Sequence, residues 1–447
     1  MLSYTRGPDA PLLEKTISQA LAETAARFPD RDALISRHQR ARLSWRELAG
    51  EVERTARGLV GLGLEPGDRV GIWATNCVQW ILLQLSTARA GLVLVNVNPA
   101  YRSHELAFVL RKSRMRALFL REQDARARYL DLLDQARQGA ELPLRHVIQL
   151  DHPSWEGMLA GGRPILYPDT LPHDVVNIQY TSGTTGSPKG VLLTHRNLVN
   201  NAWVLALGLH MNEQDRICIP VPLYHCFGCV IGVLVAVVSG AAMILPAPQF
   251  DALATLRAIH EERATTLYGV PTMFLAELEH PEFPSFDLTS LRTGIMAGAP
   301  CPIEVMKRVT DRMHCPGMTI AYGQTETSPV ITLSKVDDPL ELRVSTVGCA
   351  LPNTEVKIIH PATGVTLPVG EQGELCTRGY HVMKGYDDEP EATRKTIDPE
   401  GWLRTGDLAV LLPNGYFRIT GRAKEMIIRG GENIYPREIE EFLYTNS

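Results

Sequence analysis

The sequence predicts an α/β protein in which mostly parallel sheets are followed by a β-rich part. Three observations predict this fold class. Strand and helix patterns alternate along the first three quarters of the chain, short apolar stretches separated by Gly, Pro and Asn follow residue 344, and 45% hydrophobic with 21% charged residues can bury a large core. At about 100 to 200 residues per domain, 447 residues make two or three structural units. We expect α/β subdomains over about 1–170 and 171–343, and a β-rich subdomain over 344–421.

The first clear unit is a strand, a helix and a second strand. Residues 69–73 and the continuously apolar 92–97 have strand patterns, and residues 78–90 have a helical pattern. A strand that is apolar along its whole length is typical of parallel sheets with helices on both faces. The same alternation predicts strands at 175–180, 265–268, 291–296 and 318–322, and helices at 195–207, 251–262 and 272–279.

A long uncharged segment, residues 217–250, contains no Asp, Glu, Lys or Arg. Its length would suit a membrane-spanning helix, but prolines lie near both of its ends and glycines 228, 232 and 240 interrupt it. We therefore expect a short buried helix followed by a strand at 241–245. In the β-rich part, Asn414-Gly415 between the apolar stretches 409–412 and 416–420 predicts a hairpin.

The charge and the cysteine content exclude several classes of protein. The 45 Lys and Arg against 50 Asp and Glu give a net charge of −5, without general attraction to nucleic acid or anionic lipid. Eight scattered cysteines are too sparse for a disulfide framework. The N-terminal residues lack the apolar run of a signal peptide, and Asp9 and Glu14 argue against a mitochondrial presequence. We expect a cytoplasmic protein with reduced thiols, no nucleic-acid partner and no transmembrane segment.

A glycine-rich loop after the strand at 175–180 points to phosphate binding. Residues 180–190 read Tyr-Thr-Ser-Gly-Thr-Thr-Gly-Ser-Pro-Lys-Gly, and such a loop can offer backbone N–H groups, hydroxyls and one ammonium to a polyanion. The alternative is a surface linker, which the tightly flanking apolar strands disfavour. The loop is not a Walker A motif, because Lys189 is preceded by Pro188 and followed by Gly190. The chain also lacks the G-x-S-x-G and G-x-G-x-x-G motifs.

Five further motifs follow the loop in order: 222–228 (Pro-Leu-Tyr-His-Cys-Phe-Gly), 298–300 (Gly-Ala-Pro), 322–327 (Tyr-Gly-Gln-Thr-Glu-Thr), 402–408 (Trp-Leu-Arg-Thr-Gly-Asp-Leu) and 421–436, which opens Gly-Arg-Ala-Lys. With the loop, they resemble the adenylate-forming, AMP-binding superfamily over nearly the whole chain. The residues of several motifs are most similar to those of medium-chain or general fatty acyl-CoA synthetases.

The resemblance implies a role for each motif. The loop would bind phosphates, Gly298 to Pro300 would form a wall against adenine, Tyr322 would stack on that base, Thr325 would reach the α-phosphate and Glu326 would hold Mg²⁺. Asp407 and Arg422 would bind the ribose. The implied nucleotide-binding residues are Thr181, Ser182, Gly183, Thr184, Thr185, Gly186, Ser187, Pro188, Lys189, Gly298, Ala299, Pro300, Tyr322, Gly323, Thr325, Asp407 and Arg422. The implied catalytic residues are Lys189, Thr325, Glu326 and His225.

For some of these residues a purely structural role is an alternative to a functional one. A single histidine near apolar sequence, such as His225, is often a satisfied core residue, whereas the family pattern gives it a role in orienting the carboxylate or the pyrophosphate. Cys226 and Cys229 have the spacing of a zinc or redox pair, but without a second pair we interpret them as small buried hydrophobes. Asp407 and Arg422 can also form a structural ion pair while binding ribose.

The implied reaction activates a carboxylic acid with ATP to an acyl-adenylate, releases pyrophosphate, and transfers the acyl group to CoA. We expect a fatty acid of medium length, because the uncharged stretch 227–238 could line an apolar pocket and no cation is placed for a charged tail. Two alternatives remain: an enzyme that loads the phosphopantetheine of a carrier protein, and a non-catalytic nucleotide-binding module. A homodimer is possible in either case.

The resemblance also implies a small α+β C-terminal domain that rotates about a hinge at Lys424. Only residues 422–447 follow the large domain, so we expect the hinge and the beginning of that domain. The family's second catalytic lysine has no counterpart in this sequence. From this we expect a chain that binds nucleotide but turns over slowly.

Overall fold

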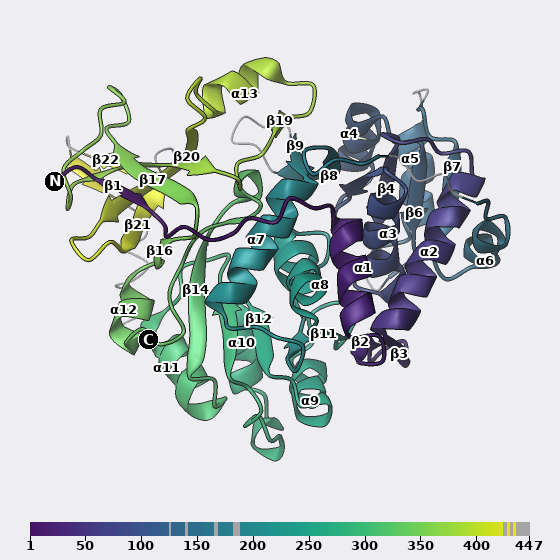
Figure 1. Cartoon of the computed structure of the whole chain (residues 1–447), viewed down its shortest axis with the longest axis horizontal. Helices are drawn as coiled ribbons and strands as arrows, with labels where there is room; N and C mark the ends of the chain where they lie inside the picture. Colours follow the sequence, from purple (N-terminus) through teal and green to yellow (C-terminus); the bar gives the residue numbers. More distant parts are fainter. Residues whose placement is uncertain are drawn as a thin grey trace.

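The computed structural model describes residues 1–124, 127–138, 142–164, 169–181 and 188–422, together with short strands at 427–429 and 432–434. Two α/β sheets lie side by side, and a five-stranded antiparallel sheet lies at one end of them (Figure 1). The predicted fold class is confirmed: mostly parallel sheets covered by helices, and a β-rich part.

The first α/β sheet has seven strands. It is parallel from β8 through β5, β4 and β6 to β7, and β9 and β19 extend it in the antiparallel sense. In spatial order its strands are β19 (Gly385–Tyr386), β9 (Lys189–Thr194), β8 (Val175–Thr181), β5 (Val93–Asn96), β4 (Arg69–Trp73), β6 (Ala117–Leu120) and β7 (His146–Gln149).

The second α/β sheet has nine strands. It is parallel from β14 to β2, with antiparallel strands at both edges. In spatial order they are β16 (Cys349–Ala350), β15 (Val330–Leu333), β14 (Gly317–Gly323), β13 (Thr293–Met296), β12 (Thr266–Gly269), β10 (Arg216–Cys218), β11 (Ala242–Leu245), β2 (Asp32–Ser36) and β3 (Ala41–Ser44).

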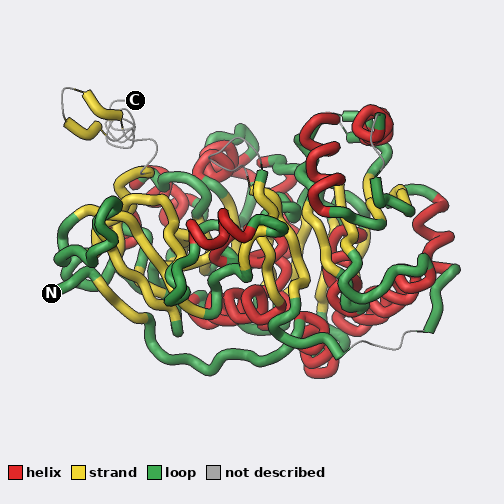
Figure 2. Tube along the Cα trace, turned by 90° about the horizontal axis from the view of Figure 1, so that it is seen from above, coloured by secondary structure: helices red, strands yellow, loops and turns green. Residues whose placement is uncertain are grey.

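A layer of helices between the two sheets forms the largest core. Neighbouring residues on one strand, such as Leu34 and Ile35, enter different cores because strand side chains alternate between faces. Figure 2 shows the strands in the middle of the molecule with helices on both sides. The central helices are α1 (Ile17–Arg27), α2 (Trp45–Gly61), α3 (Val78–Arg89), α7 (His195–Gly208), the π-helix η1 (Phe227–Leu234) and α8 (Val235–Ser239), with α6 (Pro153–Ala160) beside α2.

The outer faces of the two sheets are covered separately. Helices α4 (Ser103–Ser113) and α5 (Tyr129–Arg137) pack on the seven-stranded sheet. The nine-stranded sheet is covered by α9 (Ala252–Glu262), α10 (Pro271–Leu278), α11 (Ile303–Arg312) and α12 (Leu340–Ser345). Short 3₁₀ turns are η2 (Phe283–Ser285) and η3 (Thr325–Thr327), and α13 (Pro390–Thr396) buries none of its residues.

The β-rich part is a five-stranded antiparallel sheet with the predicted hairpin at one edge. Leu412 N–H donates to the carbonyl of Tyr416 over 2.8 Å, and Gly415 has φ +85°, as a turn glycine requires. The strands are β1 (Tyr4–Arg6), β17 (Thr354–Ile359), β18 (Gln372–Gly379), β20 (Leu403–Leu411) and β21 (Phe417–Arg422). A separate antiparallel pair joins β22 (Ile427–Arg429) and β23 (Glu432–Ile434).

The uncharged segment forms the predicted buried helix and strand. Its helix begins as a π-helix, η1, and continues as α8 before β11. Glycine allows the close packing there, because a Cβ on Gly228 would lie 2.3 Å from the carbonyl oxygen of Pro222. In the described part of the chain, no helix combines the length and the apolar character needed to cross a membrane.

The sheets are built from segments that are far apart in the sequence. β2 and β3 near the N-terminus belong to the nine-stranded sheet, whereas β8 and β9 belong to the seven-stranded one. The predicted division at 170, 343 and 421 is therefore not a division between sheets, and the division into domains stays a prediction. The chain between β1 and α1 crosses α7 (Figure 1), where Asn200 on α7 bonds both backbone groups of Leu13.

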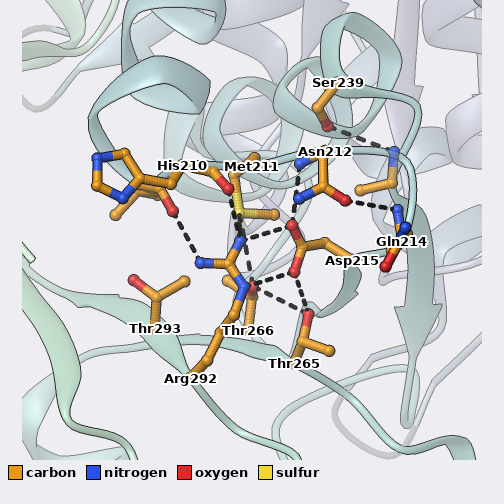
Figure 3. A network of polar contacts seen from close by, with 12 residues as sticks. His210, Met211, Asn212, Gln214, Asp215, Ser239, Thr265, Thr266, Arg292 and Thr293 are labelled. Carbon is orange, nitrogen blue, oxygen red and sulfur yellow. Dashed lines mark hydrogen bonds and ion pairs between the residues drawn. The ribbon is translucent and has the colours of Figure 1, made fainter.

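An ion pair with a buried carboxylate holds the edge of the nine-stranded sheet at which its parallel strands begin (Figure 3). Arg292, just before β13, donates from Nη2 to Oδ2 of Asp215 over 2.5 Å and from Nε to Oδ1 over 2.8 Å. The Thr265 hydroxyl donates to the same carboxylate over 2.7 Å. Arg292 also donates to the carbonyl groups of Leu209 and His210, so the beginnings of three strands and the residues after α7 meet at this ion pair.

Candidate active site

A cavity of about 1400 Å³ lies where the two α/β sheets meet the five-stranded sheet. Its walls come from all three sheets: Thr181 ends β8, Tyr322 lies near the end of β14, and Asp407 lies in β20. β8 and β14 run parallel to their neighbours β5 and β13. The cavity is thus at the carboxyl ends of parallel strands, where open α/β sheets bind ligands.

One wall of the cavity carries a carboxylate with two donors. The Tyr322 hydroxyl donates to Oδ2 of Asp407 over 2.7 Å, and Nε of Arg422 lies 3.2 Å from Oδ1. Asp407 and Arg422 are paired across β20 and β21, which fixes their register. Burial, followed by the charge of Asp407, raises the pKa of Tyr322, so its phenol stays protonated. Such a carboxylate is suited to accept hydroxyl protons of a sugar.

A second cluster joins Lys189, Tyr386 and Glu326. The Tyr386 hydroxyl donates to Oε1 of Glu326 over 2.9 Å, and Nζ of Lys189 lies 4.9 Å from the centre of the Tyr386 ring. Lys189 begins β9 and Glu326 lies in η3, directly after β14. An ammonium suited to phosphate and a carboxylate suited to a hard cation therefore contact the same tyrosine.

Two glycines allow the backbone to pass close to the cavity. A Cβ on Gly323 would lie 1.9 Å from the carbonyl oxygen of Pro329, so no side chain fits between β14 and the turn after η3. Gly298 has φ +84°, in the left-handed region that glycine adopts without strain. Both glycines contribute backbone to the cavity wall.

His225 begins an apolar part of the wall that continues with Phe227 and Ile231 on η1. The ring is accessible from the cavity, while the protein around it lowers the pKa of His225 by burial, so the imidazole is neutral near pH 7. Its Nδ1 accepts the backbone N–H of Phe227 over 3.1 Å. In the neutral ring Nε2 therefore carries the proton and is a donor.

Buried amide side chains connect this wall to the seven-stranded sheet. The Cys226 thiol donates to Oε1 of Gln179 over 3.0 Å, and Gln179 Nε2 donates to Oδ1 of Asn177 over 2.8 Å. Asn177 in turn donates to Asn96, whose Nδ2 donates to the carbonyl of Tyr224 over 3.0 Å. Because buried polar groups are costly when unpaired, this chain of bonds fixes the segment that carries His225.

The structure brings many of the predicted residues to the cavity. Pro188, Ala299 and Pro300 are described but do not line it, and the latter two are exposed. Residues 182–187 and Lys424 lie outside the described residues, so the inner part of the phosphate loop and the hinge stay predictions. The predicted residues that line the cavity are Thr181, Lys189, His225, Gly298, Tyr322, Gly323, Thr325, Glu326, Asp407 and Arg422.

Sequence reasoning missed Tyr386, Gln179 and Asn96, which also line the cavity. Tyr386 belongs to a two-residue strand that carries no strong pattern of its own. The two amides gave a stronger signal, because an Asn or Gln inside an otherwise apolar strand needs a buried partner.

Glu326 fits as the residue that would hold a magnesium ion. Among the residues that the structure describes, no three His, Cys, Asp or Glu side chains gather as a protein-only metal site would require. Glu326 is held by one donor, the Tyr386 hydroxyl, on Oε1. A single carboxylate suffices for Mg²⁺ when substrate phosphates supply further ligands.

The chain is similar to several known proteins. The AMP-binding enzyme family matches residues 21–387. The putative acyl-CoA synthetase YngI of Bacillus subtilis is 48% identical over 97% of this chain and 84% of its own length. The mitochondrial medium-chain acyl-CoA ligase ACSF2 of Rattus norvegicus is 42% identical over 99% of this chain and 77% of its own length.

A solved structure, ATP-bound MatB from Rhodopseudomonas palustris, superimposes with a TM-score of 0.83 at 30% identity, covering 95% of this chain and 82% of that one. The chain belongs to the family of AMP-binding enzymes. Its similarity to named acyl-CoA synthetases and ligases confirms the predicted enzyme class, an AMP-forming acyl-CoA ligase.

Proposed function

We propose that this enzyme activates a fatty acid of medium length with ATP, giving an acyl-adenylate and pyrophosphate, and then transfers the acyl group to CoA. The relatives named above are an acyl-CoA synthetase and a medium-chain acyl-CoA ligase, and the superimposed MatB structure holds ATP. Magnesium and CoA are part of the proposal.

The observation that carries the proposal is that two polar clusters, each suited to a different part of a nucleotide, face one cavity. In the first cluster, Lys189 contacts the ring of Tyr386 and Glu326 accepts a hydrogen bond from its hydroxyl. In the second cluster, Asp407 contacts Tyr322 and Arg422. The first cluster suits a polyphosphate with its cation, and the second suits a ribose. A nucleotide joins these two chemistries in one molecule.

The proposed chemistry is attack of the substrate carboxylate on the α-phosphorus of ATP. Negative charge grows on the phosphate oxygens, so fixed cations and N–H donors supply the catalysis. Lys189 would neutralise phosphate charge, Thr325 would donate its hydroxyl to the α-phosphate, and His225 would orient the carboxylate through its Nε2–H. When bound to Glu326, Mg²⁺ would neutralise further charge.

The acyl group would lie along the apolar wall. Phe227 and Ile231 face the cavity, and the side chains between Tyr224 and Ile231 carry no formal charge apart from the titratable His225. An apolar wall without a fixed charge favours a hydrocarbon tail over a second carboxylate.

The decisive experiment is Mg²⁺-dependent exchange of labelled pyrophosphate into ATP with a panel of straight-chain, dicarboxylic and aryl acids. We expect exchange with medium-chain fatty acids and none without an acid. If no acid supports exchange while the protein binds ATP by calorimetry, the chain is a nucleotide-binding module. Thioester formation with free CoA, compared with a phosphopantetheine carrier protein, then identifies the acyl acceptor.

The hinge at Lys424, slow turnover, a homodimer and a cytoplasmic location stay predictions. Gel filtration with light scattering tests the dimer.

A further inference from the structure

Tyr386 occupies a position that the proposed reaction leaves without a role. It lies at the cavity and contacts both charged groups proposed for the polyphosphate: its hydroxyl donates to Oε1 of Glu326 over 2.9 Å, and Lys189 Nζ lies 4.9 Å from its ring centre. The two groups come from different sheets, since Lys189 begins β9 and Glu326 follows β14. The tyrosine thus joins two walls of the cavity.

The backbone around Tyr386 is fixed on β9. Tyr386 is paired with Val191 in the antiparallel ladder, and the N–H of Asp387 donates to the carbonyl of Gly190 over 2.7 Å. The N–H of Tyr386 donates to the Thr393 hydroxyl over 2.9 Å. The backbone that carries the ring is therefore fixed to the strand that carries Lys189.

A buried ion pair anchors the next residue. Both oxygens of Asp387 accept from Arg69 on β4, over 2.8 Å and 2.7 Å, and the Asp387 side chain is only 5% exposed. A bidentate Arg–carboxylate pair fixes orientation as well as distance. The anchor ties the tyrosine to the centre of the seven-stranded sheet.

The hydroxyl and the ring of Tyr386 contact different groups, Glu326 and Lys189. The phenol donates a hydrogen bond to Glu326, and an ordinary phenol is protonated at neutral pH. A donor on one carboxylate oxygen orients the other, as outer hydrogen bonds do for metal ligands. The ring face attracts the ammonium of Lys189.

We propose that Tyr386 is a positioning residue that sets the geometry of Lys189 through its ring and of Glu326 through its hydroxyl. This rests on the proposed function, because it assigns phosphate to Lys189 and Mg²⁺ to Glu326. Hydroxyl and ring then affect separable quantities: the affinity for the cation depends on the hydroxyl, and the affinity for metal-free nucleotide depends on the ring.

Two variants separate these quantities. Tyr386→Phe keeps the ring and removes the hydroxyl, while Tyr386→Leu removes both. Calorimetry measures the Kd for ATP in EDTA, and the same titration at increasing Mg²⁺ gives the Mg²⁺ concentration at which half of the affinity gain appears. Tyr416→Phe is the matched control, because the Tyr416 hydroxyl also donates to a carboxylate, Asp338, and neither residue lines the cavity.

We expect Tyr386→Phe to raise the half-saturating Mg²⁺ concentration about tenfold and to leave the metal-free Kd within about twofold. Tyr386→Leu should in addition raise the metal-free Kd about three- to tenfold. Tyr416→Phe should change neither. An unchanged or lower Mg²⁺ requirement in Tyr386→Phe, or equal metal-free Kd values for Phe and Leu, overturns the inference. Absence of ATP binding by the wild type instead overturns the proposed function.

Discussion

Lys189 is the cation that the described part of the cavity offers next to the aromatic ring of Tyr386. Replacing it by alanine should remove a charge-assisted contact of about 1.5 to 3 kcal/mol, which corresponds to roughly a ten- to hundredfold higher Kd for ATP. Calorimetry in the presence of Mg²⁺ measures this. Lys335→Ala, an exposed lysine away from the cavity, serves as the control and should bind like the wild type. Equal affinities for both variants would remove Lys189 from the proposed site.

Replacing Glu326 should weaken the use of Mg²⁺ and leave the binding of nucleotide largely unchanged. Glu326→Gln keeps the size of the side chain but removes the negative charge, so we expect a higher Mg²⁺ requirement, by about tenfold or more, in the exchange reaction. The KM for ATP at saturating Mg²⁺ should change much less. Glu371→Gln is an exposed control outside the cavity. A variant whose Mg²⁺ curve coincides with that of the wild type would mean that another group binds the metal.

At the scale of elements, the Arg292–Asp215 pair holds the beginnings of three strands together. Asp215 is 3% exposed, so Arg292→Met leaves a buried carboxylate without its cation. We expect a loss of about 2 to 4 kcal/mol in the free energy of unfolding, at the lower end because about a third of the arginine side chain is exposed. Urea denaturation measures this.

The control for that variant is Arg46→Met, which breaks the exposed pair Arg46–Asp30 and should cost less than about 1 kcal/mol. Similar losses in both variants would show that the Arg292 network does not stabilise the sheet more than a surface ion pair does.

Local pattern predicted single elements well. The strand at 69–73 and the helix at 78–90 are β4 and α3, within a residue of the expected bounds, because apolar continuity and helical spacing are local properties. Which strands lie side by side in a sheet is not a local property of the sequence. Nothing in the sequence of β2 shows that it lies beside β11, more than 200 residues later, and not beside β4.

The same distinction holds for the site. Lys189 was predicted from the residue types of its glycine-rich loop, and Glu326 and Asp407 from the resemblance of their motifs to the family. The structure brings all three to one cavity. Tyr386 was missed because its importance lies in contacts with residues on β9 and after β14, which its neighbours in sequence do not reveal.

At the scale of the whole molecule, Glu277 makes stability depend on pH. It is 1% exposed within α10, and its Oε2 has no hydrogen-bond partner among the described residues. Burial raises the pKa of Glu277. Below about pH 4 the carboxyl is protonated in both folded and unfolded chains. As the pH rises above that value, only the unfolded chain loses the proton, so the native state loses relative stability until the folded pKa is reached.

Glu277→Gln removes this ionisation. The difference in the free energy of unfolding between variant and wild type should therefore shift in favour of the variant between pH 4.5 and pH 7.5, roughly at the ends of the sensitive range. Urea denaturation at both pH values measures the shift, with Glu371→Gln as an exposed control. A difference that is the same at both pH values would show that the native state holds Glu277 ionised.

The pairing of β1 with β17 also bears on how the molecule is made. Tyr4 lies opposite Lys357, so a ribosome delivers Tyr4 first and Lys357 only after the strands at the centres of both α/β sheets have emerged. Contacts that span such a distance form late and slowly. β1 therefore has no pairing partner while most strands of both α/β sheets are synthesised, and until β17 emerges its unpaired backbone groups are open to pairing with another chain.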